Sequence, residues 1–201
     1  GNIYRVVEWY DGFAGREPAG DAYGGMPAGP AMKREFGDVQ EFARIQTGFD
    51  KKMIRVNGRT VRSSVSFADP SLLAMFYFEI LDGEATALRD QRQVAVTKNK
   101  AIELFGTDNV IGQIIEIKNT DKFEPFQVGA VVDNIPSNSS ISFGILENIS
   151  QLLSTDEGKL SENNWNMTLG SNTFVQLRDD SKLMQQPGRL AQFRKKYYPN
   201  E

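Results

Sequence analysis

The chain has 201 residues, contains neither histidine nor cysteine, and carries a formal net charge of −3. The absence of these two residue types excludes a Ser-His-Asp triad, histidine-ligated zinc, disulfides and a cysteine nucleophile. The slightly acidic balance argues against a general nucleic-acid binder, because such proteins are usually basic. With 40% hydrophobic and 24% charged residues, the composition is typical of a folded protein that is long enough to bury a core.

The longest apolar run does not predict a membrane span. Leu72–Leu81 contains Glu79 and is shorter than the roughly 20 residues that a transmembrane helix needs, so we expect a buried element there. The chain begins at Gly1 without the charged and apolar regions of a signal peptide, and we interpret it as an excised fragment. No G-x-x-x-x-G-K-[ST] motif occurs, so we do not expect this chain to hydrolyse ATP.

Strands are predicted where residues alternate in polarity or are β-branched and aromatic. These runs are Ile3–Tyr10, Phe42–Thr47, Met53–Val56, Thr60–Phe67, Phe76–Leu81, Val94–Thr97, Ile114–Lys118, Phe126–Val132 and Thr173–Leu177. Asn57-Gly58 is the strongest hairpin signal in the chain. In the second arm of that hairpin, Arg62, Ser64 and Ser66 predict a polar face.

Helices are predicted from apolar periodicity and from capping residues. Pro30 opens a short helix that Gly37 closes, Asn99–Phe105 is closed by Gly106, and Pro187 begins a last helix. In that last helix, Leu190, Phe193 and Tyr197 form an apolar stripe. Shorter or mixed helical signals lie in Ser71–Phe76 and Phe143–Leu153. Loop or surface segments are predicted for Asp11–Gly29, Glu84–Gln93 and Ser154–Leu169.

Several side chains invite a functional interpretation and are weighed against a structural one. Three carboxylate pairs could support acid–base chemistry or calcium binding, but none has EF-hand spacing, and solvated turns are the better interpretation. The pairs are Asp179 with Asp180, Asp121 with Glu124, and Glu79 with Asp82. The basic run Arg194-Lys195-Lys196 could face an acidic lipid or partner, although the solvated face of a helix explains it better.

The aromatic residues are expected to be mainly structural. Phe76, Tyr77 and Phe78 lie in the most apolar run and predict core packing. Trp165 predicts an anchor within a loop. Trp9 and Tyr10 adjoin the glycine-rich segment, and they are the aromatic residues that we retain as a candidate exposed contact.

A series of short motifs in the middle of the chain resembles a known family. In order they are Phe67-x-Asp69-Pro70, Phe76-x-Phe78-x-x-Leu81-x-Gly83, Val94-x-Val96-Thr97, Leu104-Phe105-Gly106, Val110-Ile111-Gly112 and Phe126-x-Val128-x-x-Val131-x-Asp133-x-Pro136. Together they resemble the MacB-like periplasmic core domain of FtsX-type ABC transporter permeases, in the form common in Bacteroidetes. The closing Tyr197-Tyr198-Pro199 fits that form. Gly129, where many relatives carry Thr, and the glycine-rich Asp11–Gly29 segment depart from it.

The resemblance implies an α+β fold in two parts. A ferredoxin-like α/β half, called porter, is expected at residues 1–62 and 143–201, and an inserted β-rich half, called sabre, at residues 63–142. Our own strand and helix pattern agrees with this plan and lacks one strand of a ferredoxin-like unit after the last helix. In the family this piece leads into the second transmembrane helix, so the chain is expected to lie between two membrane helices.

The resemblance also implies a function. Such domains face the periplasm and relay movement from a cytoplasmic ATPase, through membrane helices, to exported substrates or periplasmic partner proteins. We therefore expect a non-catalytic domain without a cofactor or metal, and a full-length permease that is a homodimer in the membrane. The resemblance supplies no catalytic, cofactor-binding or metal-binding residue, and we assign none.

Two alternatives belong to other functional classes. A cell-envelope ligand- or glycan-binding module would use the cleft between the two halves, with polar groups around an aromatic platform. A hydrolase would need two carboxylates about 5–10 Å apart in a pocket.

Overall fold

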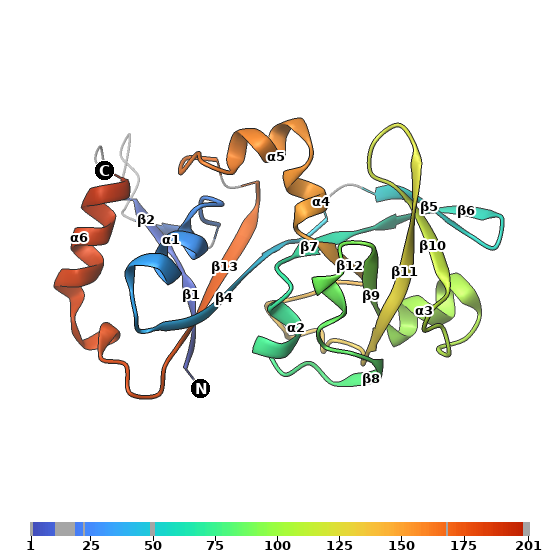
Figure 1. Cartoon of the computed structure of the whole chain (residues 1–201), viewed down its shortest axis with the longest axis horizontal. Coiled ribbons are helices and arrows are strands. Elements are labelled where there is room, and N and C mark those ends of the chain that lie inside the picture. Colours follow the sequence, from blue (N-terminus) through green and yellow to red (C-terminus); the bar gives the residue numbers. More distant parts are fainter. Residues whose placement is uncertain (1, 11–18, 22, 49–50, 168, 199–201) are drawn as a thin grey trace. The chain divides into compact units, whose positions relative to one another are not determined.

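The computed structural model describes the chain except for residues 1, 11–18, 22, 49–50, 168 and 199–201 (Figure 1). The contacts within the chain divide it into two compact units. Unit 1 comprises Gly1–Arg44 and Glu157–Glu201, and unit 2 comprises Ile45–Asp156. Unit 1 therefore contains both ends of the chain, and unit 2 is an insertion.

Unit 1 consists of a small sheet, several helices and a short two-stranded ribbon. The sheet has the order β1-β13-β4, formed by Ile3–Val6, Ser171–Leu177 and Val39–Gln46. Strands β1 and β13 are antiparallel, with Tyr4 opposite Val175. The other elements are a two-stranded ribbon of β2 (Glu8–Tyr10) and β3 (Ala19–Asp21), helices α1 (Ala28–Glu35), α5 (Asp156–Ser161) and α6 (Pro187–Tyr197), and the short helix η2 (Leu183–Gln185).

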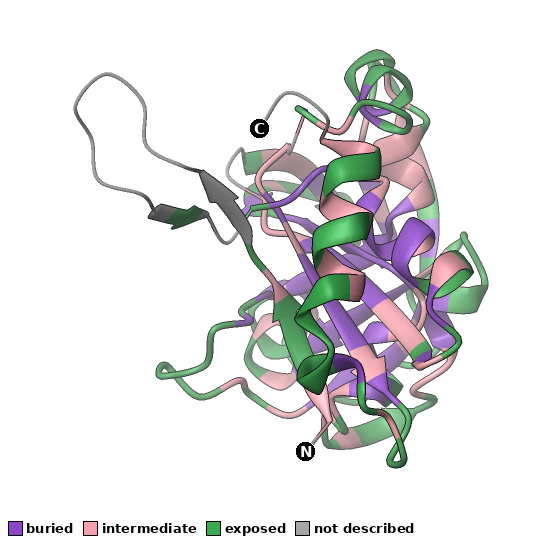
Figure 2. Cartoon of the chain, turned by 90° about the vertical axis from the view of Figure 1, so that its left-hand side faces the viewer, coloured by how far each residue is buried: buried purple, intermediate pink, exposed green. Residues whose placement is uncertain are grey.

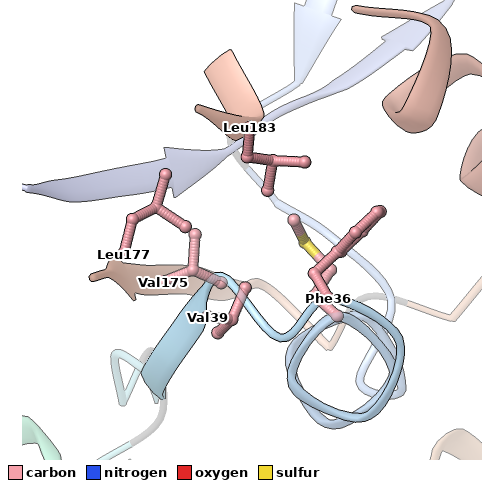
Figure 3. Close-up of a cluster of buried hydrophobic side chains, with 6 residues drawn as sticks. Phe36, Val39, Val175, Leu177 and Leu183 are labelled. Carbon is pink, nitrogen blue, oxygen red and sulfur yellow. The ribbon is translucent and has the colours of Figure 1, made fainter. Parts of the chain in front are cut away.

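The core of unit 1 joins residues from both ends of the chain (Figure 3). Met32, Phe36 and Val39 come from α1 and the start of β4, and they pack against buried residues of β13 and η2, namely Val175, Leu177 and Leu183. Met32 and Phe36 are both buried, so this side of α1 faces the core.

Unit 2 is built on a mixed sheet of seven strands in line, with one more strand at its side. The order is β7-β12-β9-β11-β10-β5-β6, and β8 pairs with β11. The last two residues of β4 pair with β7. The strands are β5 (Lys51–Val56), β6 (Arg59–Ser64), β7 (Ser66–Ala68), β8 (Ile80–Gly83), β9 (Gln93–Thr97), β10 (Ile114–Lys118), β11 (Phe123–Val132) and β12 (Ile145–Asn148). Its helices are α2 (Leu72–Met75), η1 (Ala87–Arg89), α3 (Lys98–Phe105) and α4 (Ser150–Leu153).

The strongest local signals of the sequence are confirmed in unit 2. Helix α3 ends at Gly106, which has a φ of 81° and donates its N–H to the Ile102 carbonyl. Asn57 and Gly58 have positive φ values of 49° and 76°, as a two-residue hairpin turn between β5 and β6 requires. The predicted strands at Val94–Thr97 and Ile114–Lys118 correspond to β9 and β10.

The apolar run at Leu72–Leu81 contains the clearest local error. Leu72 and Leu73 are buried as predicted, but Tyr77 is 81% exposed and has a φ of 51°. The Phe78 N–H donates to the Leu73 carbonyl, which is the hydrogen bond that closes a Schellman turn, and Tyr77 occupies its left-handed position. The predicted strand Phe76–Leu81 is therefore right only for Ile80 and Leu81, which lie in β8, and the prediction of core packing for Tyr77 was wrong.

Other boundaries differ because tertiary pairing interrupts the local pattern. The segments predicted as single strands at Ile3–Tyr10 and Thr60–Phe67 each form two strands, and Ser66 is buried instead of lying on a polar face. Helix α1 begins at Ala28 and ends at Glu35, so Gly37 does not close it. Leu88 of η1 is fully buried within the predicted surface segment, and α5 forms within the predicted loop Ser154–Leu169. Part of the predicted loop Asp11–Gly29 lies outside the described residues, and its described part includes β3 and the start of α1.

Gly129 lies at an irregularity of β11. Val128 pairs with Val94 and Ala130 pairs with Ala95, so Gly129 has no counterpart on β9. A Cβ atom at residue 129 would lie 2.2 Å from the Gln93 side-chain oxygen and 2.9 Å from the Ala87 Cβ. In this chain, a larger residue there requires the Gln93 side chain to move.

The predicted α+β fold, with a ferredoxin-like part and an inserted β-rich part, is confirmed. Unit 2 as the contacts define it begins at Ile45 and ends at Asp156. The porter-like subdomain at residues 1–62 and 143–201, and the sabre-like one at 63–142, stay a prediction. Within the part of the chain that the structure describes, no helix is both long and apolar enough to cross a membrane.

Gly58 and Gly83 have similar φ values of 76° and 78°, but their surroundings differ. Replacing each with alanine therefore distinguishes the cost of backbone strain from the added cost of a steric clash. Gly58 has open space around it, whereas a Cβ on Gly83 (φ 78°) would lie 2.2 Å from the Gly129 carbonyl oxygen. Gly58→Ala should lower the free energy of unfolding by about 1–2 kcal/mol, the cost of a left-handed alanine. Gly83→Ala should lower it by about 3 kcal/mol or more, because the backbone clash adds to that cost. Chemical denaturation of both variants measures the difference, and equal losses would contradict the packing described for β8 and β11.

Candidate functional site

Strand β1 forms one edge of the sheet of unit 1, as the strand order shows. The Leu177 N–H donates to the Asn2 carbonyl over 2.9 Å. Because hydrogen-bonded pairs alternate along an antiparallel ladder, Tyr4 and Val6 also direct their peptide groups toward β13. Ile3 and Arg5 then direct theirs toward the outer edge, where none of the described strands pairs with them.

An apolar groove of about 530 Å³ adjoins this edge. It is lined by Tyr4, Arg5, Val6, Val7, Ala28, Met32, Val175, Leu177, Leu183, Met184, Leu190, Ala191, Phe193, Arg194 and Tyr198. The lining therefore comes from β1, the residue after it, α1, β13, η2 and α6. Tyr4, Val7 and Met184 keep 39%, 48% and 55% of their surface exposed, which is high for apolar side chains of a folded domain.

Helix α6 forms one side of the groove but buries little of its own surface. Its apolar stripe of Leu190, Phe193 and Tyr197 is as predicted, yet no residue of the helix is buried (Figure 2). Near its start, Arg189 forms an ion pair of 2.7 Å with Asp38. The hydrogen bond from Arg189, together with one from Ser181, holds the pKa of Asp38 below its usual value.

An aromatic cluster holds the other end of α6. Trp165 stacks on Tyr197 with 4.3 Å between ring centroids, and it contacts Tyr198 and Phe193 edge-on at 5.2 and 6.0 Å. Lys196 pairs with Glu35 at 2.6 Å, and the hydrogen bonds from Lys196 and Tyr197 lower the pKa of Glu35. The anchoring role predicted for Trp165 agrees with these contacts.

These contacts tie α6 at both ends and leave an apolar groove between the helix and the edge of β1. Such a groove can accept an extended segment, whose backbone pairs with β1 while its apolar side chains enter beneath α6. The stripe on α6 was visible in the sequence. The edge position of β1 was not, because it depends on the pairing of β1 with a strand about 170 residues later.

The structure does not gather the carboxylate pairs into a reaction centre. Asp179 accepts a hydrogen bond from Asn2, Asp180 pairs with its neighbour Arg178, and Glu124 lies 3.7 Å from Arg92. Among the described residues, no three Asp, Glu, His or Cys side chains are close enough to hold a metal ion.

The remaining candidates lie apart from one another. In the basic run, Arg194 lines the groove, Lys195 is exposed and Lys196 pairs with Glu35. The contact considered for Trp9 and Tyr10 lies outside the residues whose side chains the structure describes.

Comparison with known families decides the class of the protein. The family model of the MacB-like periplasmic core domain matches residues 1–185, which is most of the chain. The chain belongs to this family. It is therefore a periplasmic domain of a MacB-like ABC transporter permease, and the predicted resemblance and localisation are confirmed. Membership in the ABC transporters implies an ATPase partner in general terms.

Solved structures share the fold of this MacB-like domain. A domain of a putative permease from Porphyromonas gingivalis is 21% identical with a TM-score of 0.75, and the match covers 98% of this chain and 84% of that one. The periplasmic region of MacB from Actinobacillus actinomycetemcomitans is 14% identical with a TM-score of 0.66, covering 97% and 83%. The extracellular domain of the ABC-type transporter YknZ from Gram-positive bacteria is 13% identical with a TM-score of 0.59, covering 89% and 86%. A search of curated proteins gave no match.

The anchoring of α6 can be tested through Trp165. We expect Trp165→Ala to lower the free energy of unfolding by about 2 kcal/mol, since it removes three ring contacts of a half-buried side chain. Amide hydrogens of α6 should exchange faster in this variant. Leu160→Ala in α5 is the control, because Leu160 is 69% exposed and should change stability by less than about 0.5 kcal/mol. Equal stability of the two variants would show that Trp165 does not anchor the helix.

Proposed function

We propose that this domain relays ATPase-driven movement to a substrate or partner protein outside the inner membrane. The proposal rests on how the chain is divided between the units. Unit 1 contains both ends of the chain, and unit 2 is inserted between them. Movement applied through flanking membrane helices would therefore act on unit 1 first. Unit 2 would receive it through the two places where the chain passes between the units.

In this proposal the domain performs no chemistry of its own. ATP binding and hydrolysis belong to a separate cytoplasmic ATPase subunit, which acts on the domain through membrane helices. The intact permease is a homodimer, and the domain binds no nucleic acid. The partner outside the membrane is an exported substrate or a periplasmic protein.

The groove of unit 1 has a specific role in this proposal. Its occupant is a strand of the same chain that follows α6 and pairs with the outer edge of β1. Two observations support this choice. The sheet order β1-β13-β4 with α1 and α6 is that of a ferredoxin-like unit whose sixth element would lie next to β1. A right-handed crossover from β13 through α6 also leads to a strand parallel to β13, and hence antiparallel to β1.

Spin-label distances in the full-length permease test the relay. The 201 residues contain no cysteine, so within this domain labels can be placed by single substitutions. Lys195→Cys in α6 and Arg62→Cys in β6 are both exposed, and they report on unit 1 and unit 2. We expect the distance distribution between them to change when ATP binds to the associated ATPase.

The matched control places both labels in unit 2. Within one protomer, the distance from Arg62→Cys to Gln91→Cys, which is also exposed, should be the same with and without ATP. A permease that hydrolyses ATP while the distance from Lys195→Cys to Arg62→Cys stays unchanged would contradict the relay.

A further inference from the structure

Unit 2 contains a buried carboxyl group on a central strand of its sheet. Glu147 of β12 has no exposed surface and lies between β7 and β9, opposite Phe67 and Val94. Pairing with β7 and β9 fixes the backbone of Glu147. The buried side chain can therefore reach solvent only if neighbouring segments move.

A hydrogen-bond partner of Glu147 comes from the turn between β10 and β11, at residues 119–122 (yellow in Figure 1). Asn119 donates a hydrogen bond from its side-chain amide to Glu147 Oε2 over 2.8 Å. Lys52 of β5 donates from Nζ to the amide oxygen of Asn119. Asn119 therefore bridges the ammonium group of Lys52 and the carboxyl group of Glu147.

The second carboxyl oxygen of Glu147 is buried and has no partner among the described residues. An unpaired oxygen is costly in a buried site when the group is ionised, and much less so when it is protonated. Ionisation therefore favours any rearrangement that brings water to this oxygen. In the turn at residues 119–122, which carries Asn119, the other three residues Thr120, Asp121 and Lys122 all face solvent.

We propose that Glu147 is a proton-dependent switch beneath the β10–β11 turn, which closes over the protonated carboxyl group and opens when Glu147 ionises. In the closed state Asn119 and Lys52 cover the site. In the open state water reaches Glu147, and Lys52 and Asn119 are exposed to the periplasmic medium.

Burial and the surrounding charges together set the pKa of Glu147 near neutral pH. Burial raises the pKa of Glu147 to about 7, against the opposing effects of the Asn119 hydrogen bond and the Lys52 charge. Glu124 on β11 raises this pKa further, and Arg92 before β9 lowers it. Burial also lowers the pKa of Lys52, whose ammonium group lies 4.5 Å from the centre of the Phe67 ring.

The direction of the pH effect follows from proton linkage. The folded, closed state has a higher pKa for Glu147 than the unfolded chain, whose value is near 4.5. The closed state therefore binds the proton more tightly, and proton uptake stabilises it. This stabilisation is complete below pH 4.5 and is lost as the pH rises through about 7.

Amide hydrogen exchange across the pH range tests the switch. Protection factors at residues 119–122 already account for the intrinsic pH dependence of exchange. Between pH 7 and pH 5 they should rise by up to about tenfold per pH unit, the limit for one proton. Glu147→Gln keeps the size of the side chain without its charge and should give protection that does not vary with pH. The β5–β6 turn at Asn57-Gly58 is the internal control and should show no such change.

Two further measurements keep the proposal testable if Glu147→Gln does not fold. The side-chain carboxyl ¹³C shift of Glu147 in the native domain should titrate near pH 7. In Lys52→Met, loss of the positive charge should move both this titration and the opening of the turn to higher pH. Titration near the ordinary value of 4.5, or turn protection that does not change between pH 7 and pH 5, would overturn the proposal.

Discussion

The pairing of β13 with β1 holds unit 1 together, and the other features depend on it. Residues 3–6 pair with residues 173–176, so the two ends of the chain share one small sheet. The entropy cost of closing such a long loop grows only slowly with its length, by about 0.6 kcal/mol for each doubling. An independently compact unit 2 can therefore be inserted without preventing this pairing. The same pairing leaves β1 at the edge of the sheet and creates the groove beneath α6, so architecture and proposed function have one physical origin.

Much of the local structure could be predicted because single residues determine it. Gly106 ends α3, and Asn57-Gly58 turns the chain between β5 and β6, since both places need a positive φ that these residues tolerate. The sequence gives no such signal at Tyr77, where a bulky residue occupies the left-handed position of a Schellman turn. Leu88 was misjudged for a related reason, because a single leucine within the largely polar segment Glu84–Gln93 shows no periodicity. Sequence rules predict the backbone conformation where a single residue determines it. They fail where packing against distant residues determines it.

The functional features depend on contacts between distant segments, and these could not be predicted from the sequence. Asn119 and Glu147 are 28 positions apart, and Lys52 lies 67 positions before Asn119. Each of the three is ordinary on its own, and only the sheet order of unit 2 brings them together. The groove could also be predicted only in part. The apolar stripe of α6 was recognised in the sequence, but the edge position of β1 beside it was not. The family was recognised from short motifs concentrated in unit 2, whereas the candidate site lies in unit 1.

The central claim is that unit 1 is completed by a strand of the same chain in the β1–α6 groove, which connects the domain to the moving part of the permease. Hydrogen exchange at the Ile3 and Arg5 amides measures this directly, because both are inferred to face the outer edge of β1. In the full-length permease these two amides should exchange at least about tenfold more slowly than in the 201-residue domain, as expected for newly hydrogen-bonded groups. Equal exchange in both proteins would contradict the account. Protection that appears only after another protein is added would also contradict it, because the occupant would then be a strand from a partner.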